Sequence, residues 1–258
     1  MLKSIARRIF PEEMQQLIRR LLGRDRIAQG HEVLIGDVPL ELLKGWQNAD
    51  VAQQQHAAFE PLLLAMYEGN PREDFSALTS ALELTGLDYP LIIEVGCGSG
   101  WNCEVLTHLL KRPVRYIGLD YSKSMTALGR QHYSNARFVV GDATALPLGD
   151  GVCDILLSGT VLMHLMDYGL AIQESRRVSR SWCIFHTVPI LQKRATTRLS
   201  KMAYGRHVAE VVLNEGELLE LLNRNGLVVR HVLPSIAYDL EEILMETTRT
   251  CTYVCQVV

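Results

Sequence analysis

From about residue 90 onward, short apolar segments alternate with longer amphipathic ones, and this alternation leaves the chain few folds to adopt. The segments between the short ones, residues 101–112, 122–133 and 166–178, have the apolar spacing of helices. The short segments are rich in Val, Ile and Leu with few charges, as strands buried on both faces are: 91–95, 114–120, 136–142, 152–158 and 181–188. The alternation predicts a parallel sheet with helices on both faces, wound right-handedly.

The end of the chain adds two strands without keeping strict alternation. Residues 214–226 and 239–248 have helical patterns, and residues 227–237 and 251–258 have strand patterns. The predicted fold class is therefore α/β, with a doubly wound, mostly parallel, seven-stranded sheet.

The first ninety residues have a different pattern, without a confident strand. Residues 14–24, 50–69 and 74–86 are predicted to be helices. We therefore divide the chain into a helical N-terminal cap, residues 1–87, and an α/β domain, residues 88–258. The first thirty residues carry seven basic and three acidic side chains. A solvated helix face is favoured over a membrane-surface helix for them.

Charge, cysteine spacing and hydropathy exclude several classes of protein. The net charge of −3 argues against nucleic-acid binding by bulk electrostatics. The six cysteines form no CxxC pair and no metal-ligand spacing. We therefore expect no metal site, and we expect a reducing, cytoplasmic location. No apolar run is long enough to span a membrane. Arg7 and Arg8 interrupt the apolar residues at the start, so no signal peptide is expected.

Three glycines at alternate positions follow the first predicted strand: Gly96, Gly98 and Gly100. Glycine permits positive φ and lets a ligand approach the backbone closely. The helix that follows offers unpaired N–H groups and a partial positive charge, which suit a carboxylate or a phosphate. A tight turn without a ligand would need one glycine, so three favour a binding turn.

Two cofactor classes compete for such a turn. A dinucleotide fingerprint, G-x-G-x-x-G, would need glycine at position 101, where the chain has the bulky Trp101. The observed pattern is E-x-G-x-G-x-G, from Glu94 to Gly100. On this motif and three that follow in order, residues 88–258 resemble class I S-adenosylmethionine-dependent methyltransferases of the small-molecule type (methyltransferase-domain 11/25-like).

The resemblance implies a set of cofactor contacts. The glycine turn wraps the methionine part of S-adenosylmethionine in this family. IGLDYSKSM (117–125) places an acidic residue at the ribose hydroxyls, VVGDATALPL (139–148) places one at the adenine, and CDILLSGTVLMHLMD (153–167) lies beside the methionine. For Met125, a core methionine is an equally good interpretation. The implied cofactor-binding residues are Glu94, Gly96, Cys97, Gly98, Gly100, Asp120, Tyr121, Met125, Asp142, Ala143 and Ser158.

His164 lies at the boundary between cofactor and acceptor in this comparison. It is the candidate catalytic residue, as a general base. The alternative is a histidine that takes no part in the chemistry.

Two segments could cover the acceptor site at the carboxyl ends of the strands. One is the N-terminal cap, where Trp46, Gln54, Gln55, His56 and Phe59 could lie near the cofactor. The other is the basic stretch 189–213, which could contact an anionic acceptor through Lys193 and Arg194. The alternative for Trp46 and Phe59 is a position in the core of the cap, and the alternative for the basic stretch is a solvated surface. His186 is a further candidate, with a core histidine as its alternative.

The predicted function is methyl transfer from S-adenosylmethionine to a small-molecule acceptor, with S-adenosylhomocysteine as product. Three alternatives remain open: a non-catalytic protein that binds the cofactor, a dinucleotide-dependent reductase and a nucleic-acid methyltransferase. The nucleic-acid methyltransferase has neither an added basic domain nor an Asn/Asp-Pro-Pro-Tyr motif in its support. The expected partners are the acceptor and, as one option, a second copy of the chain in a homodimer; neither a nucleic acid nor a membrane span is expected.

Overall fold

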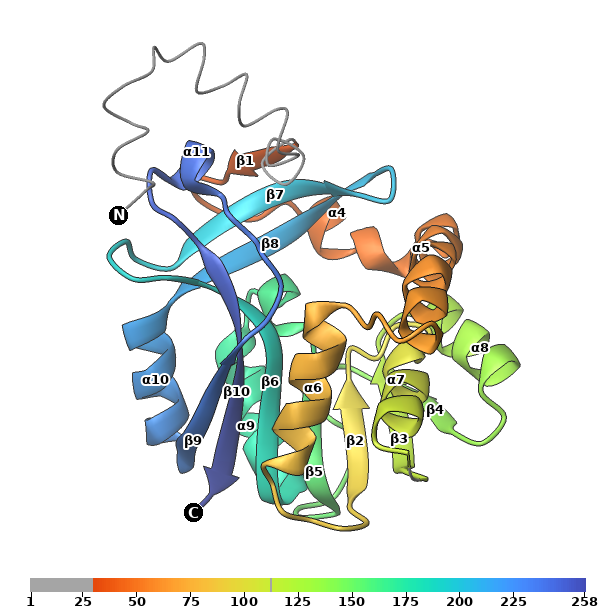
Figure 1. Ribbon diagram of the computed structural model, residues 1–258. Coiled ribbons are helices and arrows are strands. Elements are labelled where there is room, and N and C mark those ends of the chain that lie inside the picture. The colour runs from red at the N-terminus through yellow and green to blue at the C-terminus, as the bar shows by residue number, and fades with distance from the viewer. Residues whose placement is uncertain (1–29, 112) are drawn as a thin grey trace.

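The computed structural model describes residues 30–111 and 113–258, and a seven-stranded sheet forms its centre (Figure 1). The strands are β2 (Leu91–Val95), β3 (Arg115–Asp120), β4 (Arg137–Val140), β5 (Cys153–Gly159), β6 (Ser179–Leu191), β9 (Leu227–Pro234) and β10 (Arg249–Val257). Their order in space is β4-β3-β2-β5-β6-β10-β9. Strands β4 to β6 are parallel to one another, and β10 is antiparallel to both of its neighbours. The predicted α/β class with a mostly parallel sheet is confirmed.

Three further strands extend the sheet beyond β6: β1 (His31–Val33), β7 (Thr197–Ala203) and β8 (Arg206–Asn214). Strands β7 and β8 form an antiparallel hairpin, β1 pairs with β7, and the end of β8 pairs with the end of β6. These strands lie above the carboxyl ends of the parallel strands in Figure 1. The expectation of no strand in the first ninety residues is wrong for β1, because three residues are too few to leave a periodic pattern.

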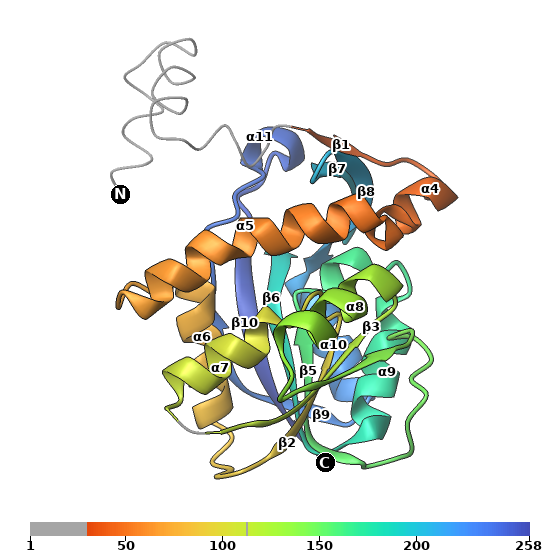
Figure 2. The ribbon, with the colours of Figure 1, turned by 90° about the vertical axis from the view of Figure 1, so that its right-hand side faces the viewer.

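Helix α5 (Ala49–Tyr67) crosses the top of the α/β domain (Figure 2). It begins where the side chain of Asn48 accepts a hydrogen bond of 2.8 Å from the backbone N–H of Asp50. Two short helices precede it, α4 (Leu40–Leu43) and η1 (Gly45–Gln47), and α6 (Glu73–Glu83) follows it. The helices predicted at 50–69 and 74–86 therefore form, and the one predicted at 14–24 lies outside the described residues.

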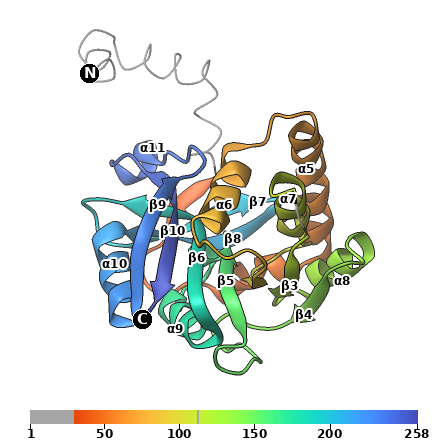
Figure 3. The ribbon, with the colours of Figure 1, turned by 60° about the horizontal axis from the view of Figure 1, so that its bottom comes forward.

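The remaining helices complete a three-layered domain, with α6 and α7 on one face of the sheet and α9 and α10 on the other (Figure 3). They are α7 (Trp101–Leu109), α8 (Lys123–His132), α9 (Tyr168–Val178), α10 (Glu215–Arg224) and α11 (Glu241–Leu244). Leu82 and Leu106 belong to the core on one face, and Ile172 and Leu222 to the core on the other. Because α6 contributes to the sheet core, the N-terminal segment is packed into the domain as well as over it.

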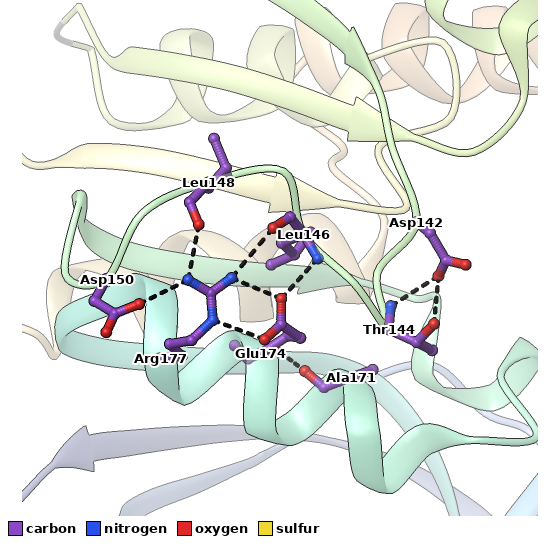
Figure 4. A network of polar contacts seen from close by, with 9 residues as sticks. Asp142, Thr144, Leu146, Leu148, Asp150, Ala171, Glu174 and Arg177 are labelled. Carbon is purple, nitrogen blue, oxygen red and sulfur yellow. Dashed lines mark hydrogen bonds and ion pairs between the residues drawn. The ribbon is translucent and has the colours of Figure 1, made fainter.

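Arg177 on α9 fixes the loop between β4 and β5 (Figure 4). Its guanidinium donates to both carboxylate oxygens of Glu174 at 2.7 Å, to Asp150 at 2.8 Å, and to two loop carbonyls, those of Leu146 and Leu148. Glu174 in turn accepts a hydrogen bond from the N–H of Leu146 at 2.7 Å. The planar, five-donor guanidinium suits this arrangement, and lysine could not reproduce it.

We predict that Arg177→Ala lowers the free energy of unfolding by about 2 kcal/mol, because several charge-assisted hydrogen bonds are lost together. Arg224→Ala removes an exposed salt bridge with Glu220 on α10 and should lower the free energy of unfolding by about 0.5 kcal/mol or less. Urea denaturation of both variants checks the difference. Equal losses would show that Arg177 is an ordinary surface residue.

Candidate functional site

A cavity of about 620 Å³ opens at the carboxyl ends of the parallel strands. Its walls come from the strand ends, from α5 and η1 of the N-terminal segment, and from the β7–β8 hairpin. Open α/β sheets bind their ligands at this edge. The cavity is therefore the candidate functional site, and it is enclosed by segments far apart in the sequence.

The glycine turn forms one end of this cavity through Gly96 and Gly98. Both have positive φ, 66° and 55°, and so does Gly100, at 91°. A β-carbon would lie 2.2 Å from Val161 at Gly96 and 2.6 Å from the Trp101 ring at Gly98. Glycine is thus required at these positions both for backbone conformation and for space. Gly100 does not line the cavity but begins α7.

Asp120, at the end of β3, ties the glycine turn to the neighbouring strand. One carboxylate oxygen accepts the N–H of Gly98 at 2.9 Å, and the other accepts the N–H of Ser122 at 2.8 Å. Burial raises the pKa of Asp120 to about 6, although these two hydrogen bonds act in the opposite direction. The side chain lines the cavity and keeps lone pairs for a ligand.

Glu94 lies behind the turn and does not line the cavity. Its carboxylate accepts hydrogen bonds from the Asn102 amide, at 2.6 Å, and from the Tyr116 hydroxyl. The side chain is fully buried, and a β-carbon at Gly159 would lie 1.7 Å from one of its oxygens. Asn102 does line the cavity. Glu94 therefore positions Asn102 and the start of α7, one layer away from any ligand.

The other residues expected at the cofactor divide into two groups. Those that line the cavity are Tyr121, Met125, Asp142 and Ala143. Cys97 and Ser158 do not line it, and the buried Ser158 hydroxyl has no hydrogen-bond partner among the described residues. The carboxylate of Asp142 accepts both the N–H and the hydroxyl of Thr144 in a local turn, which Figure 4 shows beside the Arg177 loop.

Helix α5 supplies a wall of the cavity next to the glycine turn. Gln55 lines the cavity, and its buried carbonyl oxygen, Oε1, has no hydrogen-bond partner within residues 30–111 and 113–258. His56 contacts the turn itself, with its Nδ1 2.8 Å from the Ser99 hydroxyl. The Phe59 ring stacks on Trp101 with 3.8 Å between centroids. Gln54 and His56 do not line the cavity, whereas Gln55, Phe59 and Trp46 do.

His164 lines the cavity from η2 (Leu162–His164). Its Nδ1 lies 3.0 Å from the carbonyl oxygen of Ala209 on β8. Because a carbonyl can only accept, Nδ1 carries the hydrogen and Nε2 keeps its lone pair. Burial, with a smaller contribution from the charge of Lys201, lowers the pKa of His164 to about 4. The imidazole is therefore neutral at physiological pH. The Trp46 ring packs on it with 4.8 Å between centroids.

Sequence reasoning missed several polar residues that line the cavity: Arg72, Asp74, Lys201 and Tyr238. Arg72 and Asp74 form a pair with two hydrogen bonds of 2.6 Å. Lys201 comes from the basic stretch 189–213, but Lys193 and Arg194 of that stretch do not line the cavity. The Arg194 guanidinium instead donates to the Leu244 carbonyl at 2.6 Å. His186 does line the cavity.

Backbone strain gathers at the same site. Thr160, Thr187 and Tyr204 have positive φ of 61°, 55° and 49°, and all three line the cavity. This conformation is unfavourable for residues with a β-carbon, above all for β-branched threonine. Such strain persists where the surroundings impose it, commonly at ligand sites.

Two searches of the described residues gave no further site. No group of three or more His, Cys, Asp or Glu side chains in this part of the chain is arranged to hold a metal ion. No helix there has the length and hydropathy to cross a membrane.

The buried Glu94 predicts a pH dependence of stability. Burial raises the pKa of this carboxyl to about 7. The folded state thus binds a proton that the unfolded state releases near pH 4.5, and stability falls as the pH rises through this window. Between pH 5 and 7, the free energy of unfolding of wild-type protein should fall by about 1 kcal/mol more per pH unit than that of Glu94→Gln, whose side chain stays neutral. Denaturant titrations at several pH values measure this, and parallel slopes would contradict it.

Comparison with known proteins agrees with this architecture. Residues 93–185 match the family model described as a methyltransferase domain. The chain is 29% identical over 161 residues to demethylmenaquinone methyltransferase of Shouchella clausii, covering 60% of this chain and 61% of that protein. It is 28% identical over 158 residues to an uncharacterized 37.1 kDa protein in a transposon of Streptomyces fradiae, covering 56% of this chain and 44% of that protein. The chain thus spans about half the length of the curated relatives it matches.

Solved structures share the fold. The Burkholderia thailandensis 1,6-didemethyltoxoflavin-N1-methyltransferase, with bound 1,6-didemethyltoxoflavin and S-adenosylhomocysteine, superposes with a TM-score of 0.58 at 14% identity, covering 90% of this chain and 96% of that one. A Haloferax volcanii putative methyltransferase in complex with the Trm112 activator gives a TM-score of 0.56 at 16% identity, covering 83% of this chain and 96% of that one. The resemblance stated from the sequence is confirmed: residues 93–185 match the methyltransferase-domain model, and solved methyltransferase structures share the fold of the chain.

Proposed function

We propose that the protein transfers a methyl group from S-adenosylmethionine to a small-molecule acceptor. The observation that carries this proposal is the glycine turn, where two left-handed glycines face the cavity and a hydrogen bond fixes the turn to Asp120. The arrangement leaves backbone open to a ligand at the start of a helix. The curated relative and the solved structure named above, which carry methyltransferase names for a menaquinone precursor and a toxoflavin precursor, support a small-molecule acceptor.

The residues present fit the cofactor. A β-carbon at Gly96 or Gly98 would meet Val161 or the Trp101 ring, so only glycine lets the backbone of this turn line the cavity. The unpartnered Gln55 Oε1 beside Gly98 is an acceptor for an amino group. We assign the amino-acid part of the cofactor to this end, with Asn102 as a further donor. Asp120 would accept from the ribose hydroxyls, while Met125, Asp142 and Ala143 would surround the adenine. Cys97, Gly100, Ser158 and Glu94 would act by shaping the turn and the strands beneath it.

The chemistry needs little from the protein beyond positioning and exclusion of water. When bound, S-adenosylmethionine would supply a methyl group attached to a sulfonium. The methyl group would be transferred to the acceptor by in-line displacement, with the C–S electron pair remaining on sulfur. Holding two reactants in line lowers a barrier by about 7–11 kcal/mol in well-oriented systems. Helix α5 and the β7–β8 hairpin close the cavity from above and would exclude water.

His164 is the residue we assign to proton removal from the acceptor. Its neutral imidazole presents the Nε2 lone pair, because Nδ1 donates to the Ala209 carbonyl. It can accept the proton that a hydroxyl or amine loses as its oxygen or nitrogen forms the new bond to carbon. The low pKa of about 4 suits an acceptor that is itself acidic.

The setting we propose is the cytoplasm. All six cysteines are free and buried thiols. Thiols that persist without pairing fit a reducing compartment.

We predict that Gly98→Val abolishes cofactor binding while the protein still folds. The new side chain would meet the Trp101 ring and the Gln55 side chain and would strain the positive φ of this residue, which displaces the turn that we assign to the cofactor. S-adenosylhomocysteine should raise the melting temperature of wild-type protein but not that of Gly98→Val. Gly169→Ala, where a β-carbon meets nothing within 4 Å, serves as the matched control and should respond like wild type. A normal shift in Gly98→Val would count against the assigned site.

We expect His164→Gln to bind S-adenosylhomocysteine normally and to transfer methyl groups about 10²- to 10⁴-fold more slowly, the range for loss of a general base. Transfer of tritium from methyl-labelled S-adenosylmethionine to a panel of hydroxylated and amine acceptors measures this. The control is His207→Gln, an exposed histidine on the β7–β8 hairpin whose Nδ1 contacts the Ser200 hydroxyl at 3.2 Å. Cofactor binding without turnover of any acceptor by wild type would favour a non-catalytic role.

A further inference from the structure

A buried carboxylate at the base of the β7–β8 hairpin gathers donors from three separate parts of the chain. Glu210 on β8 has no exposed surface. It pairs with the Lys201 ammonium of β7 at 2.5 Å, accepts a hydrogen bond from the Tyr238 hydroxyl, and lies 3.8 Å from Nε2 of His31 on β1. Burial alone would raise the pKa of Glu210, but Lys201 and His31 lower it to about 2. Glu210 is therefore an anion at every physiological pH.

This arrangement fixes a cation at the wall of the cavity. Lys201 lines the cavity, and its side chain is 16% exposed. Its ammonium carries three donors. Within the described part of the chain, Glu210 is its one ion-pair partner, so donors remain for a ligand. Tyr238 also lines the cavity and lies under the ammonium, with 5.6 Å from Nζ to the ring centroid.

The second charged pair of the cavity is less suited to hold a ligand. Both oxygens of Asp74 accept from the Arg72 guanidinium, at 2.6 Å each. The guanidinium carbon lies 5.2 Å from the ring centroids of both Phe59 and Phe75. Arg72 is thus occupied by a carboxylate along one edge and by rings on its faces, whereas Lys201 is held from one side only.

Lys201 shares the cavity with His164 and with several aromatic rings. Trp46 packs against His164 and also lies 6.0 Å, between centroids, from the Tyr204 ring. Trp46, Tyr204 and Tyr238 all line the cavity. A planar ligand would contact these rings, and it would meet a neutral acceptor, Nε2 of His164, and a cationic donor, Lys201, in the same cavity.

We propose that Lys201, held in place by Glu210, binds an oxygen atom of the acceptor, and that the acceptor is a ring compound with an acidic hydroxyl group of the phenol or enol type. This inference rests on the proposed function. A fixed cation stabilises the anionic form of a bound hydroxyl and so lowers its pKa. The proton then passes to Nε2 of His164, because Nδ1 donates to the Ala209 carbonyl.

The test uses 4-nitrophenol, whose phenolate absorbs visible light, added to the protein with S-adenosylhomocysteine present. At a pH where about half of the free phenol is ionised, wild-type protein should increase the phenolate absorbance. In the double variant Lys201→Met/Glu210→Gln, which removes both charges together, phenolate binding should weaken at least about tenfold, as loss of a hydrogen bond to a charged group predicts. Lys193→Met, an exposed lysine that does not line the cavity, should behave as wild type.

A second variant and a second compound keep the test specific. Lys201→Arg preserves the charge and should preserve the increase in phenolate. Binding of 4-nitroanisole, which has no ionisable hydroxyl, should be the same in wild type and the double variant. An unchanged phenolate signal in the double variant, or no phenolate signal in wild type that binds S-adenosylhomocysteine, overturns the inference alone. Failure of wild type to bind S-adenosylhomocysteine overturns the proposed function instead.

Discussion

The hydrogen bond from the Gly98 N–H to the Asp120 carboxylate is the contact on which the site depends. It joins the turn after β2 to the end of β3, so two neighbouring strands present their ends at one fixed spacing. The positive φ of the glycines and the lack of room for a β-carbon at Gly96 and Gly98 leave no other residue type for the turn. The backbone of the turn is therefore already in the conformation that faces the cavity. This preorganisation reduces the conformational entropy that is lost when a ligand binds.

The segments that cover this turn lie outside residues 93–185, which match the methyltransferase-domain model. Helix α5 brings Gln55 and Phe59 against the turn, and the β7–β8 hairpin brings Lys201 to the other end of the cavity. Between them, Trp46 contacts both His164 and Tyr204. The end of the cavity that we assign to the cofactor is thus built by strands within residues 93–185, and the end that we assign to the acceptor by segments outside that match.

The central sheet and the glycine turn at one end of the cavity could be predicted from the sequence because both depend on local signals. Buried parallel strands leave continuous apolar runs, and Gly96, Gly98 and Asp120 stand directly after two of them. The orientation of Glu94 could not be read, since a buried acidic residue at a strand end can face either the ligand or the protein. Lys201, Tyr238 and Arg72 reach the cavity only through tertiary packing of the hairpin and the N-terminal segment. The charge pattern suggested Lys193 and Arg194, but both lie before β7 and away from the cavity. The Arg194 guanidinium donates to the Leu244 carbonyl, and the Lys193 N–H donates to the Glu246 carboxylate.

The most direct test of the account is calorimetric titration of the purified protein with S-adenosylhomocysteine and, separately, with NADH. We expect binding of S-adenosylhomocysteine alone, with an affinity in the micromolar range, about −8 kcal/mol. The Trp101 side chain, stacked on Phe59 where a dinucleotide turn would have its third glycine, should prevent binding of NADH. Binding of NADH without S-adenosylhomocysteine would contradict the assignment of the glycine turn and with it the proposed methyl transfer.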